Sequence, residues 1–326
     1  MIVKTTPEYL DLLNRAAARE IQVSAQYMLQ HTKMDKLSRK VIAENILLDE
    51  TTYDAFGKLL KDFAIQEMKH LGAIFERIYV LGGNATTKPD KITIGDSIKE
   101  FAELGYKAEE EALELYRQVI EAAKNIGDRE TWQMFSKIYS DEEEHLLAFE
   151  EYLEIEKEPD LGETPESEWR SIFNPDYIAL LNKALASEIS AIIQYTNQHE
   201  KADGLDKMRR KKTALEVISD KNKASVVSKM LKEVFLQEME HMEKIAERIY
   251  EIDREALATV DPLPEIGNSV EDFIKLDRDA ENYAIVLYRK VIEEATKLGD
   301  IKTKKMFENI IQEEEEHYWM FDDFLP

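Results

Sequence analysis

Residues Gln66–His70 read QEMKH, and nearly the same pentapeptide, QEMEH, returns at Gln237–His241. Two further segments repeat in step with it: TPEYLDLLNRA at 6–16 returns as NPDYIALLNKA at 174–184, and LYRQVI at 115–120 returns as LYRKVI at 287–292. The offset between the copies rises only from 168 to 172 residues along the chain. Such a small drift indicates that insertions fall between helices, so the chain encodes one domain twice.

Length and composition agree with two helical domains. A chain of 326 residues exceeds the usual size of one domain, and each half is long enough to bury a core. The composition is 44% hydrophobic and 34% charged, with only 11 glycines and 8 prolines, which favours long amphipathic helices over strands and turns. We therefore predict an all-α fold of two tandem four-helix bundles.

Charge and cysteine content exclude several classes of partner and site. The formal net charge of −24 makes nucleic acid and anionic membranes poor partners and cations good ones. The chain has no cysteine, so thiolate metal sites and disulfides are excluded, and histidine and carboxylate must bind any metal. The N-terminal residues lack a signal-peptide pattern and no apolar run approaches bilayer length, so we expect a soluble, cytoplasmic protein.

The boundary between the two domains is predicted from composition. The segment Glu158–Glu168, EPDLGETPESE, has the proline, glycine and charge of an exposed linker. We expect a first bundle at residues 1–158, a linker at 159–168 and a second bundle at 169–326.

Each copy should contain four helices. In the first copy, Thr6-Pro7-Glu8 is a typical helix start, and the later helices are expected at Phe63–Leu81, from Ser97 to about Gly127, and at Arg129–Tyr152. The corresponding fourth helix of the second copy is expected at Ile301–Phe324. Residues from about 36 to 60 are expected to form a long connector that contains either no regular structure or an extra helix.

Four Glu-x-x-His pairs indicate metal sites. A helical bundle can bind two metal ions through one glutamate from each of two helices and a Glu-x-x-His from each of the other two, because a three-residue step places both side chains on one helix face. Iron in oxygen chemistry favours such carboxylate and imidazole ligands. The chain contains this set twice: Glu20, Glu67, His70, Glu109, Glu142 and His145 in the first copy, and Glu188, Glu238, His241, Glu281, Glu314 and His317 in the second.

A tyrosine follows each single glutamate by seven residues on the same helix face, as Tyr27, Tyr116, Tyr195 and Tyr288. These tyrosines could donate hydrogen bonds to the ligand carboxylates or supply an electron during oxidation; we name Tyr27 and Tyr195 as candidate catalytic residues. Alternatively, they are interior tyrosines whose hydroxyl groups need a partner in any case.

The chain resembles bacterioferritin and its ferritin-like relatives. The resemblance is carried by the segment 14–27, NRAAAREIQVSAQY, by EMKH at 67–70 followed by Glu76-Arg-Ile, and by DEEEH at 141–145, and it covers nearly all of both copies. It implies that Glu67 and Glu142 bridge two irons, with Glu20 and His70 completing one and Glu109 and His145 the other. In the second copy, Glu238 and Glu314 would bridge, Glu188 would pair with His241, and Glu281 with His317.

The resemblance also raises the question of haem. Met68 and Met239 each follow the implied bridging glutamate, where bacterioferritin places the methionine that ligates haem between two subunits. The two methionines would therefore face each other between the bundles and bind haem, or they simply pack at that interface. The chain departs from the family in its longer first connector and in ending at Phe324–Pro326 without a fifth helix, so a 24-subunit storage shell is not implied.

These observations predict a ferroxidase that binds two iron ions per bundle, with manganese or a mixed pair as alternative metals. Its expected partners are Fe(II), a small oxidant (O₂ or H₂O₂), an external electron donor and further copies of the chain in a homo-oligomer. Two other functions remain open. One is rubrerythrin-like scavenging of peroxide or oxygen, although Ala112 and Ala284 stand where rubrerythrin has an additional glutamate. The other is a non-catalytic iron-binding or haem-binding assembly protein.

Overall fold

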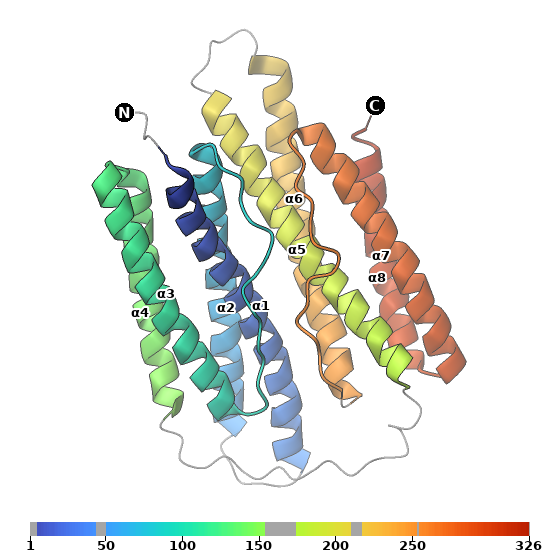
Figure 1. Cartoon of the computed structure of the whole chain (residues 1–326). Helices are drawn as coiled ribbons and strands as arrows, with labels where there is room; N and C mark the ends of the chain where they lie inside the picture. The colour runs from blue at the N-terminus through green and yellow to red at the C-terminus, as the bar shows by residue number, and fades with distance from the viewer. Residues whose placement is uncertain (1–4, 44–49, 154–173, 210–216, 253, 326) are drawn as a thin grey trace. The chain divides into compact units, whose positions relative to one another are not determined.

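The computed structural model describes residues 5–43, 50–153, 174–209, 217–252 and 254–325. Within them, all regular secondary structure is helical, and the chain divides into two compact units, Met1–Gly162 and Glu163–Pro326. The first unit contains α1 (Pro7–Ala43), α2 (Glu50–Val80), α3 (Ile98–Ile126) and α4 (Arg129–Leu153); the second contains α5 (Pro175–Arg209), α6 (Val217–Glu251), α7 (Val270–Leu298) and α8 (Ile301–Asp322) (Figure 1). The predicted pair of four-helix bundles is confirmed. The boundaries at 158 and 168 stay predictions, because residues 154–173 lie outside the described residues.

The ends of the helices follow local sequence signals. Ser97 precedes α3 and its side chain accepts a hydrogen bond from the backbone of Glu100, and Gly127 ends the helix with a φ of 74°. Only glycine adopts that backbone conformation without strain, so the helix stops there. In the second bundle, Ser269 and Asp272 form a reciprocal capping box at the start of α7.

The described part of the expected connector at residues 36–60 is helical, but it belongs to α1 and α2 rather than to an extra helix, and residues 44–49 lie outside the described residues. Helix α1 continues to Ala43, and α2 begins at Glu50 rather than near Phe63. The extension of α2 is stabilised because Tyr53, Phe56 and Leu60 are buried. An aspartate at position 49 precedes this helix start, but no proline follows it as Pro7 follows Thr6, and the sequence pattern missed it.

A long crossover joins α2 to α3 and lies along α1 (Figure 1). Gln30 of α1 donates to the carbonyl oxygen of Ile94 at 2.7 Å, and Lys33 donates to that of Gly95 at 2.8 Å. In the second bundle, Ser190 donates to Pro262 O and Lys201 to Gly267 O, both at 2.6 Å. The crossover returns the chain to the far end of the bundle, so α3 runs parallel to α2 and antiparallel to α1.

A buried arginine fastens one end of each bundle. Arg77 of α2 bonds to the side chains of Asp128 and Thr131 at the turn between α3 and α4, and Tyr9 of α1 donates to the same Asp128 at 3.0 Å. Arg248, Asp300, Thr303 and Tyr177 repeat this arrangement in the second bundle.

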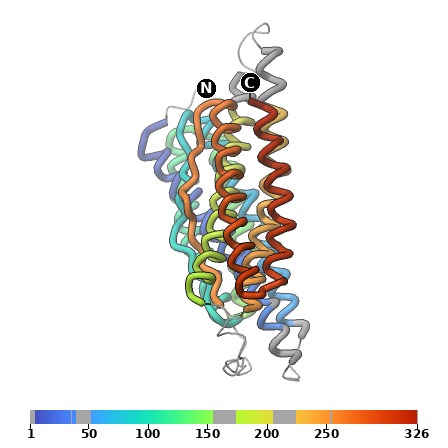
Figure 2. The backbone as a smooth tube through the Cα atoms, turned by 90° about the vertical axis from the view of Figure 1, so that its right-hand side faces the viewer, coloured from blue at the N-terminus to red at the C-terminus, as the bar shows by residue number. Residues whose placement is uncertain are grey.

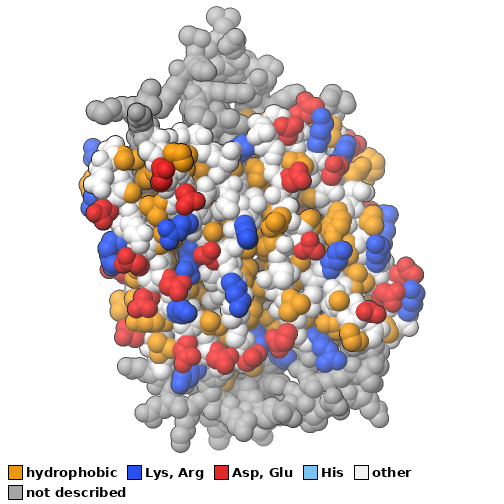
Figure 3. Space-filling model, viewed as in Figure 1, with side chains coloured by type: hydrophobic (Ala, Val, Ile, Leu, Met, Phe, Trp, Pro, Cys, Tyr) orange, Lys and Arg blue, Asp and Glu red, His pale blue; other side chains and the backbone are white. Residues whose placement is uncertain are grey.

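The paired helices lie side by side over most of their lengths, as α7 and α8 do in Figure 2. On the face shown in Figure 3, acidic and basic side chains are interspersed rather than gathered into one patch. None of the described helices combines the length and the apolar character needed to cross a bilayer.

Candidate metal centre

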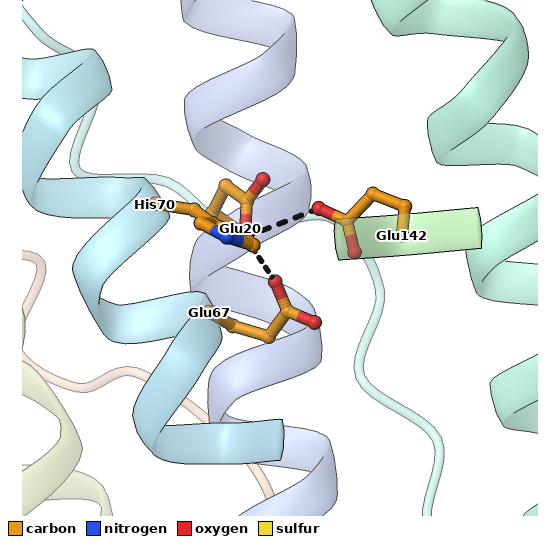
Figure 4. Close-up of side chains that lie close together, drawn as sticks. All are labelled: Glu20, Glu67, His70 and Glu142. Carbon is orange, nitrogen blue, oxygen red and sulfur yellow. Dashed lines mark hydrogen bonds and ion pairs between the residues drawn. The ribbon is translucent and has the colours of Figure 1, made fainter. Parts of the chain in front are cut away.

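Six ligand-type side chains meet at the centre of the first bundle. Helix α1 supplies Glu20, α2 supplies Glu67 and His70, α3 supplies Glu109, and α4 supplies Glu142 and His145; none is more than 5% exposed. Figure 4 shows one half of the group, in which Glu20, Glu67 and Glu142 turn toward His70 from three different helices. The structure therefore brings together all six residues named from the sequence.

Glu67 and Glu142, the central glutamates of this bundle, each give one oxygen to each histidine. Glu67 places Oε2 2.9 Å from Nδ1 of His70 and Oε1 2.8 Å from Nδ1 of His145. Glu142 places Oε1 3.1 Å from the first nitrogen and Oε2 3.0 Å from the second. A carboxylate that divides its two oxygens between two imidazoles in this way is oriented to bridge two metal ions.

Glu20 and Glu109, the lone glutamates, each approach only one histidine. An oxygen of Glu20 lies 3.9 Å from Nδ1 of His70, and an oxygen of Glu109 lies 3.9 Å from Nδ1 of His145. The six residues thus form two overlapping groups of four that share the central glutamates, and the ligand atoms within each group all lie within 4.8 Å of one another.

The second bundle repeats this geometry. Glu238 lies 3.1 Å from Nδ1 of both histidines, and Glu314 lies 3.1 Å from that of His241 and 3.4 Å from that of His317. The lone glutamates, Glu188 and Glu281, each stand 3.8 Å from their own histidine. The centroids of the two imidazole rings are 6.3 Å apart in both bundles.

The four tyrosines bind the lone glutamates in a crossed pattern. Tyr27 of α1 donates to Glu109 of α3, while Tyr116 of α3 donates to Glu20 of α1. The second bundle has the same pattern, in which Tyr195 donates to Glu281 at 2.5 Å and Tyr288 donates to Glu188. The sequence placed each tyrosine near a lone glutamate of its own helix, whereas each bonds to the one on the facing helix. A redox role for Tyr27 or Tyr195 stays a prediction.

In each bundle, a further carboxylate contacts the outer nitrogen (Nε2) of one histidine, and the sequence did not predict these contacts. Nε2 of His70 lies 3.1 Å from Asp141, and Nε2 of His241 lies 2.8 Å from Glu313. Such partners fix the tautomer and orientation of a metal-binding imidazole. The only sequence signal is that each acid immediately precedes a central glutamate, inside an acidic run that reads as a solvated face.

The charges in the metal-free site are shared among acids and imidazoles. Burial alone would raise the pKa of Glu67, but its contacts with His145 and His70 outweigh burial and lower that pKa to about 2. Burial and the neighbouring carboxylates raise the pKa values of Glu20 and Glu109 well above their ordinary range.

The histidines carry the compensating protons. Burial would lower the pKa of His70, yet contacts with Glu142 and Glu67 raise it to about 12, and the same two acids raise that of His145 to about 10. In the second bundle, contacts with Glu238 and Glu314 raise the pKa of His241 to about 12 and that of His317 to about 9, again against the effect of burial. Each metal-free site therefore holds two imidazolium ions at neutral pH.

The donor set fits a pair of divalent metal ions. Glu20 Oε2 is buried in the first site and has no hydrogen-bond partner, and Glu67 Oε1, Glu142 Oε1, Glu238 Oε1 and Glu314 Oε1 approach only imidazole nitrogens. Buried acceptors without partners are costly unless a cation occupies the space between them. Four carboxylates and two imidazole nitrogens per bundle match the ligands that iron and manganese favour.

Met68 and Met239 are half-buried, and each is adjacent in sequence to a central glutamate. Their expected role in binding haem involves both bundles, and the positions of the bundles relative to one another are not determined. Haem binding therefore stays a prediction.

Comparisons with known proteins identify the relatives of this chain. A family model described as the ferritin-like domain matches residues 10–157 and 213–326. The bacterioferritin of Desulfovibrio desulfuricans is 32% identical over 142 residues, which cover 43% of this chain and 72% of that protein. The bacterioferritin of Rhodobacter capsulatus is 32% identical over 151 residues, which cover 45% of this chain and 79% of that protein.

Two solved structures are also similar. The Desulfovibrio desulfuricans bacterioferritin, described with its diiron site in different catalytic states, superposes with a TM-score of 0.41 and 29% identity over 48% of this chain and 81% of that chain. The Rhodobacter capsulatus bacterioferritin, described with a metal-free dinuclear site and haem iron, superposes with a TM-score of 0.38 and 25% identity over 46% of this chain and 86% of that chain.

Proposed function

Because the chain belongs to the ferritin-like domain family and carries two bacterioferritin-like domains in tandem, we propose that each bundle is a ferroxidase centre. Each centre binds two Fe(II) ions as substrate and oxidises them to Fe(III) with O₂ or H₂O₂. Two Fe(II) ions release two electrons, which together with two protons reduce H₂O₂ to two molecules of water or O₂ to H₂O₂. One chain thus handles four iron ions.

The orientation of the central glutamates is the observation that carries this proposal. Glu67 and Glu142 each direct one oxygen toward each histidine, so a pair of ions between the histidines would share both carboxylates. Bridging carboxylates keep two ions close enough to give up their electrons to one oxidant molecule, and they remain bound when the ions gain charge.

Charge balance supports two divalent ions per bundle. Four buried carboxylates and two neutral imidazoles carry four negative charges, which two Fe(II) ions neutralise. In the metal-free protein, the imidazolium protons and the raised pKa values of the lone glutamates supply that neutralisation instead. Metal binding exchanges these protons for metal ions, so it should also stabilise the fold.

The test measures Fe(II) binding and oxidation in the whole chain. Metal-free protein is titrated with Fe(II) without oxygen and then mixed with O₂ or H₂O₂, and Fe(III) formation is followed by its absorbance. The wild-type protein should bind about four Fe(II) per chain, on the template of two ions per bundle, and oxidise them. The double variant Glu142→Ala, Glu314→Ala should do neither. Its matched control is Glu144→Ala, Glu316→Ala, which removes two exposed acids from the same helices.

The same experiment separates the alternative functions. A scavenger would turn over peroxide or oxygen many times when a reductant is supplied, whereas a ferroxidase consumes one oxidant equivalent for each loaded iron pair. Ala112 and Ala284 are buried in α3 and α7, three residues after the lone glutamates, so the additional rubrerythrin ligand has no counterpart there. A non-catalytic protein would bind iron without oxidising it. Metal analysis of protein purified without oxygen distinguishes iron, manganese and mixed pairs.

A further inference from the structure

The second bundle contains a cavity that reaches its metal site from the surface. The cavity has a volume of about 280 Å³, and the four glutamates of the site form part of its wall. Ser187 and Ser190 of α5 and Tyr283 of α7 also line it. Its rim includes Leu263 on the crossover, which is 58% exposed, and the exposed acid Asp279. A hydrated cation can therefore pass from an acidic rim to the ligands without crossing the apolar core.

The first bundle has different side chains at the positions that line this cavity. The repeat aligns Arg19 with Ser187, Gln22 with Ser190, and Glu111 with Tyr283. Arg19 donates a hydrogen bond to Gln22 at 3.2 Å and forms an ion pair with Glu111, so Arg19 contacts both of the other replacements. The guanidinium group thus connects α1 to α3 over the place where the second bundle is hollow.

Two further differences close this region in the first bundle. Nε of Arg19 lies 3.8 Å from Asp90 on the crossover, so the ion-pair cluster connects the crossover to α1 and α3. Val23, which is 2% exposed, replaces Ala191, which lines the cavity and is partly exposed. The first bundle thus has a larger apolar side chain and a bridging arginine at positions that line the cavity of the second bundle.

Volume rather than charge distinguishes the two routes. The positive charge of Arg19 lies beside the negative charges of Glu111 and Asp90, so the cluster presents no net positive charge to an incoming cation. At the rim of the second cavity, Asp279 is likewise paired with Arg278 at 3.2 Å. The ion-paired side chains themselves therefore obstruct the route in the first bundle.

We propose that divalent iron enters the second site directly through this cavity, whereas Arg19 closes the equivalent route in the first bundle, so that the two sites of one chain load at different rates. This inference rests on the proposed function only in requiring that both sites bind metal. Arg19 and Ser187 are then the residues that determine access, although neither contacts the metal.

The test uses chains with one working site and follows metal uptake rather than turnover. Glu142→Ala leaves only the second site, and Glu314→Ala leaves only the first. Each full-length variant is mixed with CoCl₂ in a stopped-flow instrument, and binding is followed by the visible absorbance of coordinated Co(II). The second site should load about tenfold faster than the first, because binding that requires a rearrangement of the protein is slower.

Exchanging the two residues should exchange the rates. Arg19→Ser in the chain with only the first site should raise its loading rate about tenfold, and Ser187→Arg in the chain with only the second should lower it about tenfold. The controls are Arg15→Ser, which makes the same change, and Ala179→Arg, which likewise introduces an arginine, at exposed positions of the same helices. Arg19→Gln keeps most of the side-chain volume without the charge, so it separates repulsion from blocking.

The outcomes distinguish this inference from the proposed function. Equal loading rates at the two sites, unchanged by Arg19→Ser and Arg19→Gln, would show that Arg19 does not close the first route, while both metal sites remain in place. Chains that bind no Co(II) at either site would overturn the proposed function, and the proposed difference in loading would fall with it. Should Ser187→Arg not fold, the two Arg19 variants decide the matter alone, because they remove contacts only at the surface of the first bundle.

Discussion

The two bundles hold the same six ligands in nearly the same geometry, but their surroundings differ. The contacts of the central glutamates with the histidines span 2.8–3.1 Å in the first bundle and 3.1–3.4 Å in the second. Around this shared core, three pairs of aligned positions carry different residues. They are Arg19 and Ser187, Asp141 and Glu313, and Gly105 and Asp277. The comparison teaches that the six ligand-type side chains are the same in both bundles, whereas the residues around them differ.

The pair Gly105 and Asp277 shows how far the surroundings differ. A Cβ atom at Gly105 would lie 2.4–2.7 Å from the ring of Phe149, so this position admits no side chain in the first bundle. In the second bundle, Asp277 is fully buried and accepts a hydrogen bond from Gln194 at 2.8 Å, while its other oxygen has no partner. Burial raises the pKa of the Asp277 carboxyl well above its ordinary value, against the effect of Gln194 and Gln198.

The largest expected effect tests whether the bundles unfold separately. Arg77→Ala leaves the buried Asp128 without its cation and should destabilise the first bundle by about 3 kcal/mol. Arg248→Ala should do the same to the second bundle through Asp300. Calorimetry of the metal-free protein should show that each variant lowers one unfolding transition by about 8 °C and leaves the other in place.

Arg117→Ala is the control for this prediction, because Arg117 is exposed and pairs only with acids and a tyrosine at the surface. It should change stability by less than about 0.5 kcal/mol. A single transition that both core variants shift together would show instead that the two bundles unfold as one unit.

The second prediction concerns pH. The metal-free histidines have pKa values of about 12 and 10 in the first bundle and about 12 and 9 in the second, so metal must displace at least two protons per bundle at pH 7. The overall constant for binding the Co(II) pair should therefore rise at least about hundredfold per pH unit between pH 6 and 8 in each single-site chain. An affinity independent of pH would contradict the assigned charge states.

The same pKa values predict how the metal-free protein responds to alkali. A histidine whose pKa is raised in the folded state stabilises the fold fully below about pH 6.5 and loses that contribution as pH rises through the folded value. Both bundles should lose stability as the pH rises above about 6.5. His317 has the lowest of the four values, so its contribution should be exhausted first, by about pH 9. Thermal unfolding between pH 7 and 10 measures the order.

The third prediction compares the outer carboxylates. Asp141→Ala should weaken metal binding in the first bundle by tenfold or more, because it frees the outer nitrogen of His70. Glu313→Ala should have the larger effect of the two, since its contact with His241 is shorter, 2.8 Å against 3.1 Å. Competition titrations with a metal chelator measure both. Glu143→Ala, at an exposed neighbouring position, should leave the affinity unchanged.

The smallest expected effect concerns Asp277. Because its pKa is raised in the folded state, its contribution to stability is greatest below its unfolded pKa and falls as pH rises. An asparagine at this position cannot ionise, so Asp277→Asn does not lose stability as the pH rises. Its side-chain oxygen can still accept the hydrogen bond from Gln194. The variant should therefore melt at a higher temperature than the wild type at pH 7, and the difference should shrink toward pH 4. Asp279→Asn, at an exposed position two residues later, should show no such trend.

The sequence predicted the helices and the ligand groups wherever local chemistry marks them. Thr6-Pro7 gave the start of α1, and Gly127 gave the end of α3. Only Glu142 in the run DEEEH has the three-residue spacing to His145, and the structure turns that residue into the bundle while Glu143 and Glu144 face solvent. Helical periodicity alone therefore separated the buried acid from its exposed neighbours.

The features that the sequence missed depend on contacts between helices. Nothing in the local sequence distinguishes Asp141 from a solvated acid, because its partner, His70, comes from another helix. The early start of α2 follows from the packing of Tyr53 and Phe56, which local propensity does not reveal. The role proposed for Arg19 likewise depends on its contacts with Glu111 on α3 and Asp90 on the crossover, which local sequence does not reveal.

The crossed tyrosines have a consequence for assembly. Since Tyr27 holds Glu109 and Tyr116 holds Glu20, each of the two helices orients a ligand that belongs to the other. Sliding α1 past α3 by a single turn would break both bonds at once and leave two buried acids without donors. The two crossed hydrogen bonds therefore favour a single register of α1 against α3, the register in which the six ligand-type side chains meet.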